Sequence, residues 1–239
     1  MDIELLKMVM GRTHLKLISP RAVYGPLTWQ RESLPVIDLA NLGFSPASKM
    51  KQLKRNYFNP EAAEVFRKKR QGRRGQSYTS LTFYPHGETK VSRSMGFCMN
   101  AIVLTEFNHH QSVTVQYRTT ELLSKFHADM HFLPWVFDQL EIVPQLITFQ
   151  LANAFLSGCF LPSLFTQFDP DEFYEWTSKN ADPKLHYFFA RYFWKRYQDP
   201  KKDLGYSAAK RQHALAWKHP EVTRRALRWI EANVNVKGF

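Results

Sequence analysis

Cysteine is scarce in this sequence, and so are the marks of a secreted protein. The 239 residues include two cysteines, Cys98 and Cys159, too few for a disulfide scaffold or a cysteine-rich zinc module. Residues 1–4 are acidic where a signal peptide carries basic residues, and no long apolar run follows them. We therefore expect an intracellular, cytoplasmic protein in a reducing compartment.

Charge is absent from one long stretch, residues 142–168. A stretch of this length could cross a bilayer as a helix. It also contains Pro144, Pro162 and several side-chain amides, which a membrane-spanning helix would bury in lipid at a cost. We interpret residues 146–151 as a buried strand and expect no membrane contact.

Acidic residues are outnumbered, with 21 Asp and Glu against 33 Lys and Arg, which gives a net charge of +12 at pH 7. Such an excess favours polyanionic partners. Most of it lies between Lys49 and Arg74, a segment with ten basic and two acidic residues. A run of this kind is commonly a solvated surface, and the alternative is nucleic-acid binding. The candidate nucleic-acid-binding residues are Lys51, Lys54, Arg55, Arg67, Lys68, Lys69 and Arg70.

The spacing of apolar residues predicts an α+β fold. Alternation at 101–107 and 112–117 predicts a β-hairpin around a turn at 108–111. From Thr119 the spacing becomes helical, with Pro134 as a kink. We expect further strands at 34–42 and 78–84. Helices should start at Asn59-Pro60, Asp169, Pro183 and Pro220. Residues 1–168 should form the core, with a basic insertion at 46–75, and residues 169–239 a helical, aromatic-rich extension.

Cys98 and Arg118 lie at the two ends of the predicted hairpin. A guanidinium group beside a thiol lowers the thiol pKa, so Arg118 would favour the thiolate form of Cys98. The simpler interpretations are a small buried cysteine and an ion pair between Arg118 and Glu121. His127 and His131 lie one helical turn apart and could bind a metal, but no third ligand is identified and no metal site is assigned.

The segments around Cys98 and Arg118 resemble the thymidylate synthase superfamily, which includes the deoxycytidylate and deoxyuridylate hydroxymethylases. Gly96-Phe97-Cys98-Met99 is similar to the family's Pro-Cys-His nucleophile, and Gln116-Tyr117-Arg118-Thr119 is similar to its Gln-Arg-Ser phosphate segment. Asp129, eleven positions after Arg118, stands where the family reads the pyrimidine edge. The remaining substrate-binding residues that the resemblance implies are Arg21, Asn153, and the pair Arg73 and Arg74, which in the family reaches the neighbouring subunit.

The resemblance implies a mixed β-sheet packed with helices, a homodimer, and one-carbon transfer to C5 of a pyrimidine deoxynucleotide, such as hydroxymethylation. Cys98 would add to C6, Arg118 and Arg21 would hold the phosphate, and Asp129 would select the base. The donor implied is methylenetetrahydrofolate, and such a compact enzyme would suit a bacteriophage that modifies its DNA. The family's histidine is Met99 here. The alternative is therefore an inactive protein of this fold that binds nucleic acid through its basic segments.

Overall fold

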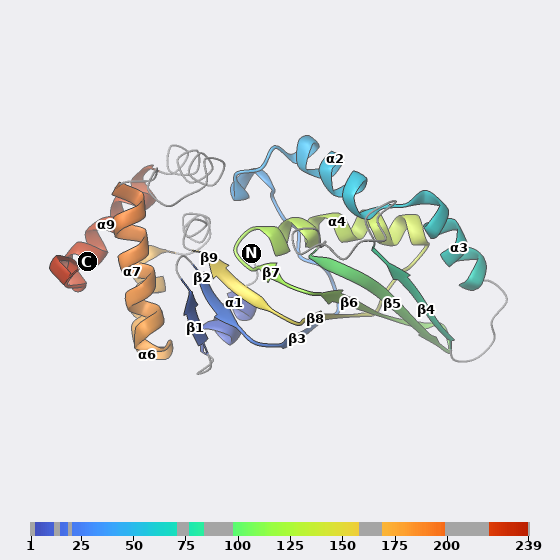
Figure 1. The fold of residues 1–239 in the computed structure, drawn as a ribbon, viewed down its shortest axis with the longest axis horizontal. Coiled ribbons are helices and arrows are strands. Elements are labelled where there is room, and N and C mark those ends of the chain that lie inside the picture. The colour runs from blue at the N-terminus through green and yellow to red at the C-terminus, as the bar shows by residue number, and fades with distance from the viewer. Residues whose placement is uncertain are drawn as a thin grey trace.

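The computed structural model of the protein describes residues 3–11, 15–18, 21–70, 77–83, 98–157, 169–198 and 220–238. Strands and helices are mixed along the chain, and the architecture is α+β (Figure 1). The elements are α1 (Ile3–Met10), β1 (Leu15–Ile18), β2 (Arg21–Tyr24), β3 (Leu27–Arg31), η1 (Ala40–Leu42), α2 (Pro46–Tyr57), α3 (Pro60–Arg70), β4 (Ser77–Thr82), β5 (Met99–Phe107), β6 (His110–Tyr117), β7 (Thr120–Glu121), α4 (Lys125–Leu140), β8 (Leu146–Leu151), β9 (Ala154–Ser157), α6 (Pro170–Asn180), α7 (Pro183–Gln198), α9 (Pro220–Asn233) and η3 (Val236–Gly238).

A five-stranded sheet in the order β3-β8-β6-β5-β4 carries the helices α2, α3 and α4 on one face (Figure 1). Its strands pair antiparallel except for β6 and β8, which are parallel. The predicted hairpin is confirmed as β5 and β6. Its turn is shorter than expected, because Phe107 already pairs with His110 and leaves Asn108 and His109 as the loop, both with positive φ.

The core lies between this sheet and α4. Val115 and Phe149 from neighbouring strands are fully buried, and so is Phe126 of α4. The predicted buried strand at 146–151 is confirmed as β8. The strand expected at 34–42 is wrong: this segment is irregular and then forms the 3-10 helix η1, which ends at Gly43 in the left-handed conformation.

Helix α4 begins at Lys125 rather than at Thr119, because Thr120 and Glu121 form β7, which pairs with β9, and a turn at 122–124 follows. The side chain of Glu121 in β7 is buried and accepts hydrogen bonds from the backbone N–H groups of Ser124 and Ser157. Burial raises its pKa above the ordinary value. Pro134 lies inside α4, which continues past it as a single helix. Through its hydrogen bonds to Ser124 and Ser157, Glu121 joins the start of α4 to β9 of the second sheet, whose strand order is β1-β2-β9-β7.

The C-terminal helices α6, α7 and α9 contact one another at the end of the molecule opposite α3 (Figure 1). The predicted starts at Asp169, Pro183 and Pro220 are confirmed. The rings of Tyr174 and Trp229 stack at 4.6 Å between α6 and α9. None of the helices in the described residues is both long enough and apolar enough to cross a membrane.

Candidate functional site

Cys98 lies directly before β5, beside the end of β6. Its backbone carbonyl accepts a hydrogen bond of 2.9 Å from the backbone N–H of Arg118. Its own N–H donates to the hydroxyl of Tyr57 at 3.2 Å, from the last residue of α2. The hairpin therefore places Cys98 and Arg118 side by side, and Tyr57 ties this end of the sheet to the helix layer.

The thiol of Cys98 is half-buried, and burial raises its pKa above the ordinary value. The charge of Asp129 raises this pKa further, while Lys125, Arg118 and Lys49 lower it in part. Arg118 therefore lowers the thiol pKa as expected, but burial outweighs the nearby cations and the net shift is upward. Burial therefore disfavours the thiolate form of Cys98, which is the form that acts as a nucleophile.

Asp129 lies on the buried side of α4 and is 4% exposed. Burial raises the pKa of its carboxyl group to about 7, although Lys49 and Lys125 oppose the shift. Such a carboxyl group can take up or release a proton at neutral pH, as a general acid or base must. Burial, and after it the charge of Asp129, also raises the pKa of Tyr57 and of Tyr117.

The hydroxyl of Tyr117 has no hydrogen-bond partner among the described residues, although it is buried. A buried hydroxyl without a hydrogen bond costs free energy, so a ligand that formed a hydrogen bond with Tyr117 would recover that free energy on binding. We use the name Cys98 cluster for the side chains here whose charges shift one another's pKa values: Lys49, Tyr57, Cys98, Tyr117, Arg118, Lys125 and Asp129.

Sequence reasoning missed four members of the cluster. Tyr117 adjoins Arg118, and Lys125 lies one helical turn before Asp129, so both could have been found from the residues already singled out. Lys49 and Tyr57 come from α2, and no local pattern in the sequence links them to Cys98.

The other residues that the resemblance implies are placed in part. Asn153 is exposed in the turn between β8 and β9, and its carbonyl accepts a hydrogen bond of 3.0 Å from the N–H of Thr120. It therefore lies at the same end of the sheet as Arg118. Arg21 begins β2 opposite Ser157, and its side chain lies outside the described residues. Arg73 and Arg74 also lie outside them.

Two further features of the sequence, the Arg118–Glu121 ion pair and the pair His127 and His131, can be compared with the structure. The Glu121 carboxylate is buried and bonded to its own turn and to β9, so it does not pair with Arg118. Nδ1 of His131 lies 2.8 Å from the carbonyl oxygen of Ile37, and burial lowers the pKa of His127 to about 3. Within the described ranges, no three His, Cys, Asp or Glu side chains are grouped so as to hold a metal.

Two arginines of the basic segment, Arg67 and Arg70, serve the packing of α3 against α4. Arg67 donates to the carbonyl of Gln139 at the end of α4. Arg70 donates to the carbonyl of Glu141 and forms an ion pair of 2.9 Å with Glu106 of β5. Cations at a helix C-terminus satisfy its last carbonyls and complement its dipole. These contacts account for Arg67 and Arg70 without any nucleic acid.

The lysines around them are more exposed. Lys68 pairs with Glu64 on the surface of α3, and Lys69 is exposed. The ammonium group of Lys54 lies 4.2 Å from the ring centroid of Trp135 in α4, a cation–π contact. Of the predicted nucleic-acid-binding residues, Lys51, Arg55 and Lys69 are exposed and make no ion pair or ring contact with a described residue, and the first two lie together on α2.

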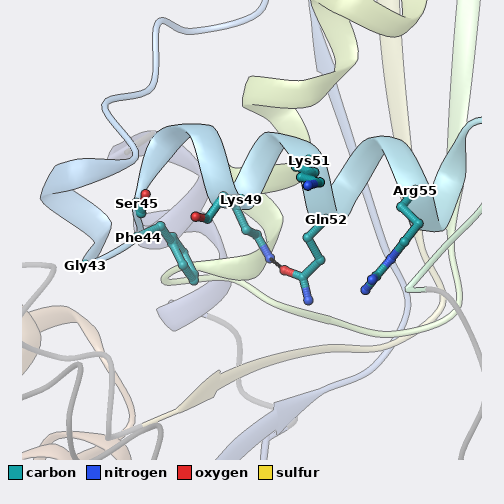
Figure 2. Close-up of a pocket in the computed structure, with 8 residues that line it drawn as sticks. Gly43, Phe44, Ser45, Lys49, Lys51, Gln52 and Arg55 are labelled. Carbon is teal, nitrogen blue, oxygen red and sulfur yellow. Dashed lines mark hydrogen bonds between the residues drawn. The ribbon is translucent and has the colours of Figure 1, made fainter.

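A hollow of about 650 Å³ lies against α2, and both Lys51 and Arg55 are among the residues that line it (Figure 2). Lys49 lies inside it, with its ammonium group 4.8 Å from the ring centroid of Phe44 and 3.3 Å from Oε1 of Gln52. Because Lys49 also belongs to the Cys98 cluster, the hollow adjoins that cluster. Its lining residues are Gly43, Phe44, Ser45, Ser48, Lys49, Lys51, Gln52 and Arg55.

Comparison of the chain with known protein families and with curated proteins gives no match in either. Functional assignment therefore rests on the geometry and charge of the Cys98 cluster and of the hollow beside it.

Proposed function

We propose that the protein is a one-carbon transferase acting on C5 of a pyrimidine deoxynucleotide, with a thymidylate-synthase-like arrangement and Cys98 as nucleophile. The observation that carries the proposal is the direct backbone hydrogen bond between Cys98 and Arg118, with Asp129 near enough to act on the thiol. Base and phosphate belong to one small molecule, so the residues that attack the base and hold the phosphate must be neighbours.

In the proposed reaction the Cys98 thiolate forms a bond to C6, and the electron pair of the C5–C6 double bond moves to C5. C5 then takes a proton from solvent and afterwards releases, as a proton, the hydrogen that it first carried, which is the exchange that tritium reports. Departure of the thiolate restores the double bond. Arg118 suits a bidentate contact to phosphate.

Asp129 suits recognition of either pyrimidine. As a carboxylate it accepts from the amino group of cytosine, and when protonated it donates to the carbonyl of uracil. With a pKa of about 7, both forms are present at neutral pH. The choice between deoxycytidylate and deoxyuridylate is therefore an outcome of the assay below.

The donor, of the methylenetetrahydrofolate class, would be a second substrate. The rings of Tyr57 and Phe83, on the α2 side of Cys98, are 9% and 7% exposed and pack edge to face at 5.6 Å. They present no open face on which a pterin could stack. These two rings therefore offer a pterin no stacking surface, and the test uses proton exchange at C5, which needs no donor.

The test is release of tritium from C5-labelled deoxyuridylate and deoxycytidylate, with and without methylenetetrahydrofolate. We expect release that is lost in Cys98→Ser, retained in Cys159→Ser, and shifted to a higher KM in Arg118→Ala. Absence of release from both nucleotides, or release that survives Cys98→Ser, contradicts the proposal.

We also propose that two copies associate through the sheet face opposite the helices. Its side chains are uncharged and exposed or half-exposed, whereas the chain carries +12. Strongly basic molecules repel one another unless they meet through a surface without like charge. The face comprises Thr28, Gln30, Tyr78, Ser80, Thr82, Val103, Thr105, Ser112, Thr114, Gln116, Thr148 and Gln150.

Multi-angle light scattering should give twice the chain mass of 28.1 kDa for the wild type. Thr114→Lys, at the centre of the face, should give the monomer mass. Ser178→Lys, on the exposed side of α6, should leave the dimer intact. A monomeric wild type, or a Thr114→Lys variant that stays dimeric, contradicts this interface.

A further inference from the structure

Helix α2 carries cationic side chains that form no ion pair with another described residue. Lys51 and Arg55 are exposed and have no acidic partner in the described ranges. In contrast, Arg70 of α3 is paired with Glu106, and Lys68 is paired with Glu64. The two free cations of α2 both line the hollow.

The lining of the hollow suits phosphate. No acidic residue is among its described lining residues, and Gln52 adds a side-chain amide that can donate. In Figure 2, Phe44, Lys49, Gln52 and Arg55 extend to the same side of the helix. An aromatic ring beside a row of cations is the combination by which proteins hold single-stranded nucleic acid, with bases on rings and phosphates on cations.

The spacing favours a chain of phosphates over a single one. Lys49 and Arg55 are six residues apart, which is roughly 9 Å along the helix axis. Lys51 precedes Arg55 by one helical turn, so these two side chains are neighbours on the helix surface. A volume of about 650 Å³ exceeds what one phosphate fills and lies in the range of sites for larger ligands.

We propose that the α2 hollow binds the phosphates of single-stranded nucleic acid through Lys49, Lys51 and Arg55, with Phe44 beside a base. This site goes beyond the proposed function, because holding a strand needs no chemistry at Cys98. Of the basic segment at residues 49–74, the proposed site uses only residues of α2 to bind nucleic acid. Lys49, whose charge lowers the pKa of both Cys98 and Asp129, is thereby shared between this site and the Cys98 cluster.

Fluorescence anisotropy of a labelled oligo(dT) 12-mer with the full chain, between 50 and 200 mM NaCl, tests the site. Three phosphate contacts predict a slope of log K against log salt of about −2, since each contributes roughly −0.7 on a single strand. The Lys51→Gln/Arg55→Gln variant should bind at least about tenfold more weakly, with a slope near −0.7. The Lys68→Gln/Lys69→Gln control removes the same charge from α3 and should change the affinity by less than about threefold.

Equal weakening by both double variants, or absence of binding by the wild type, overturns the site. Competition with inorganic tripolyphosphate is a further test. If tripolyphosphate displaces the labelled oligonucleotide as well as unlabelled oligo(dT) does at equal phosphate concentration, the hollow holds a compact polyphosphate and the strand site is overturned. Cys98→Ser should bind the oligonucleotide like the wild type while losing tritium release. Failure of this site and failure of the proposed function are therefore read from different measurements.

Discussion

Replacing Asp129 with asparagine tests the charge inside the Cys98 cluster with little change in side-chain size. In the folded protein Asp129 titrates near pH 7, whereas an aspartate in an unfolded chain titrates near 3.9. The folded state therefore binds this proton more tightly. Stability is highest below the unfolded pKa, falls as the pH rises toward 7, and levels off above it. The loss is about 4 kcal/mol at pH 8 and under about 2 kcal/mol at pH 5.

Urea unfolding of the wild type and of Asp129→Asn at pH 5 and pH 8 measures this loss. Between the two pH values, the difference in unfolding free energy should move in favour of the variant by about 2.5 kcal/mol. Glu121 has a raised pKa as well, but it is present in both proteins, so its contribution cancels. A difference that does not change with pH, or one that moves toward the wild type, refutes a buried carboxyl group with a pKa near 7.

Arg70→Ala should lower the free energy of unfolding by about 2 kcal/mol, because the α4 carbonyls and a half-buried carboxylate lose their guanidinium donor. Lys69→Ala should stay within about 0.5 kcal/mol, and equal losses would contradict the capping role. In a Cys159→Ser background, iodoacetamide should modify Cys98 more slowly than a free cysteine at pH 7.5, because the pKa of this thiol is raised. Lys125→Gln should slow it further, and faster modification would mean that Lys125 does not lower the thiol pKa.

The elements that are predictable from the sequence carry local signals. The Asn59 side chain accepts hydrogen bonds from the N–H groups of Glu61 and Ala62, as its place before Pro60 predicts. Asp169 caps α6 in the same way. The β5–β6 hairpin follows from alternation alone, because both strands bury one face against α4 and leave the other open.

The elements that sequence reasoning missed depend on contacts between distant segments. Helix α2 buries only Leu53 and Tyr57, so its apolar pattern is too sparse to predict a helix. The strand β7 is two residues long and exists through its pairing with β9. Tyr57 joins the Cys98 cluster because α2 crosses the end of β5, and no local sequence pattern specifies that crossing.

The charges around Cys98 oppose one another, and a bound nucleotide would change their balance. Phosphate on Arg118 would neutralise a cation that lowers the thiol pKa and would by itself disfavour the thiolate. A base that holds Asp129 in its neutral form would act the other way, because it removes the anion that raises the thiol pKa. Activation of Cys98 therefore depends on the base more than on the phosphate. Inorganic phosphate should leave the rate of iodoacetamide modification unchanged or lower it, and a rate that rises with phosphate would contradict this account.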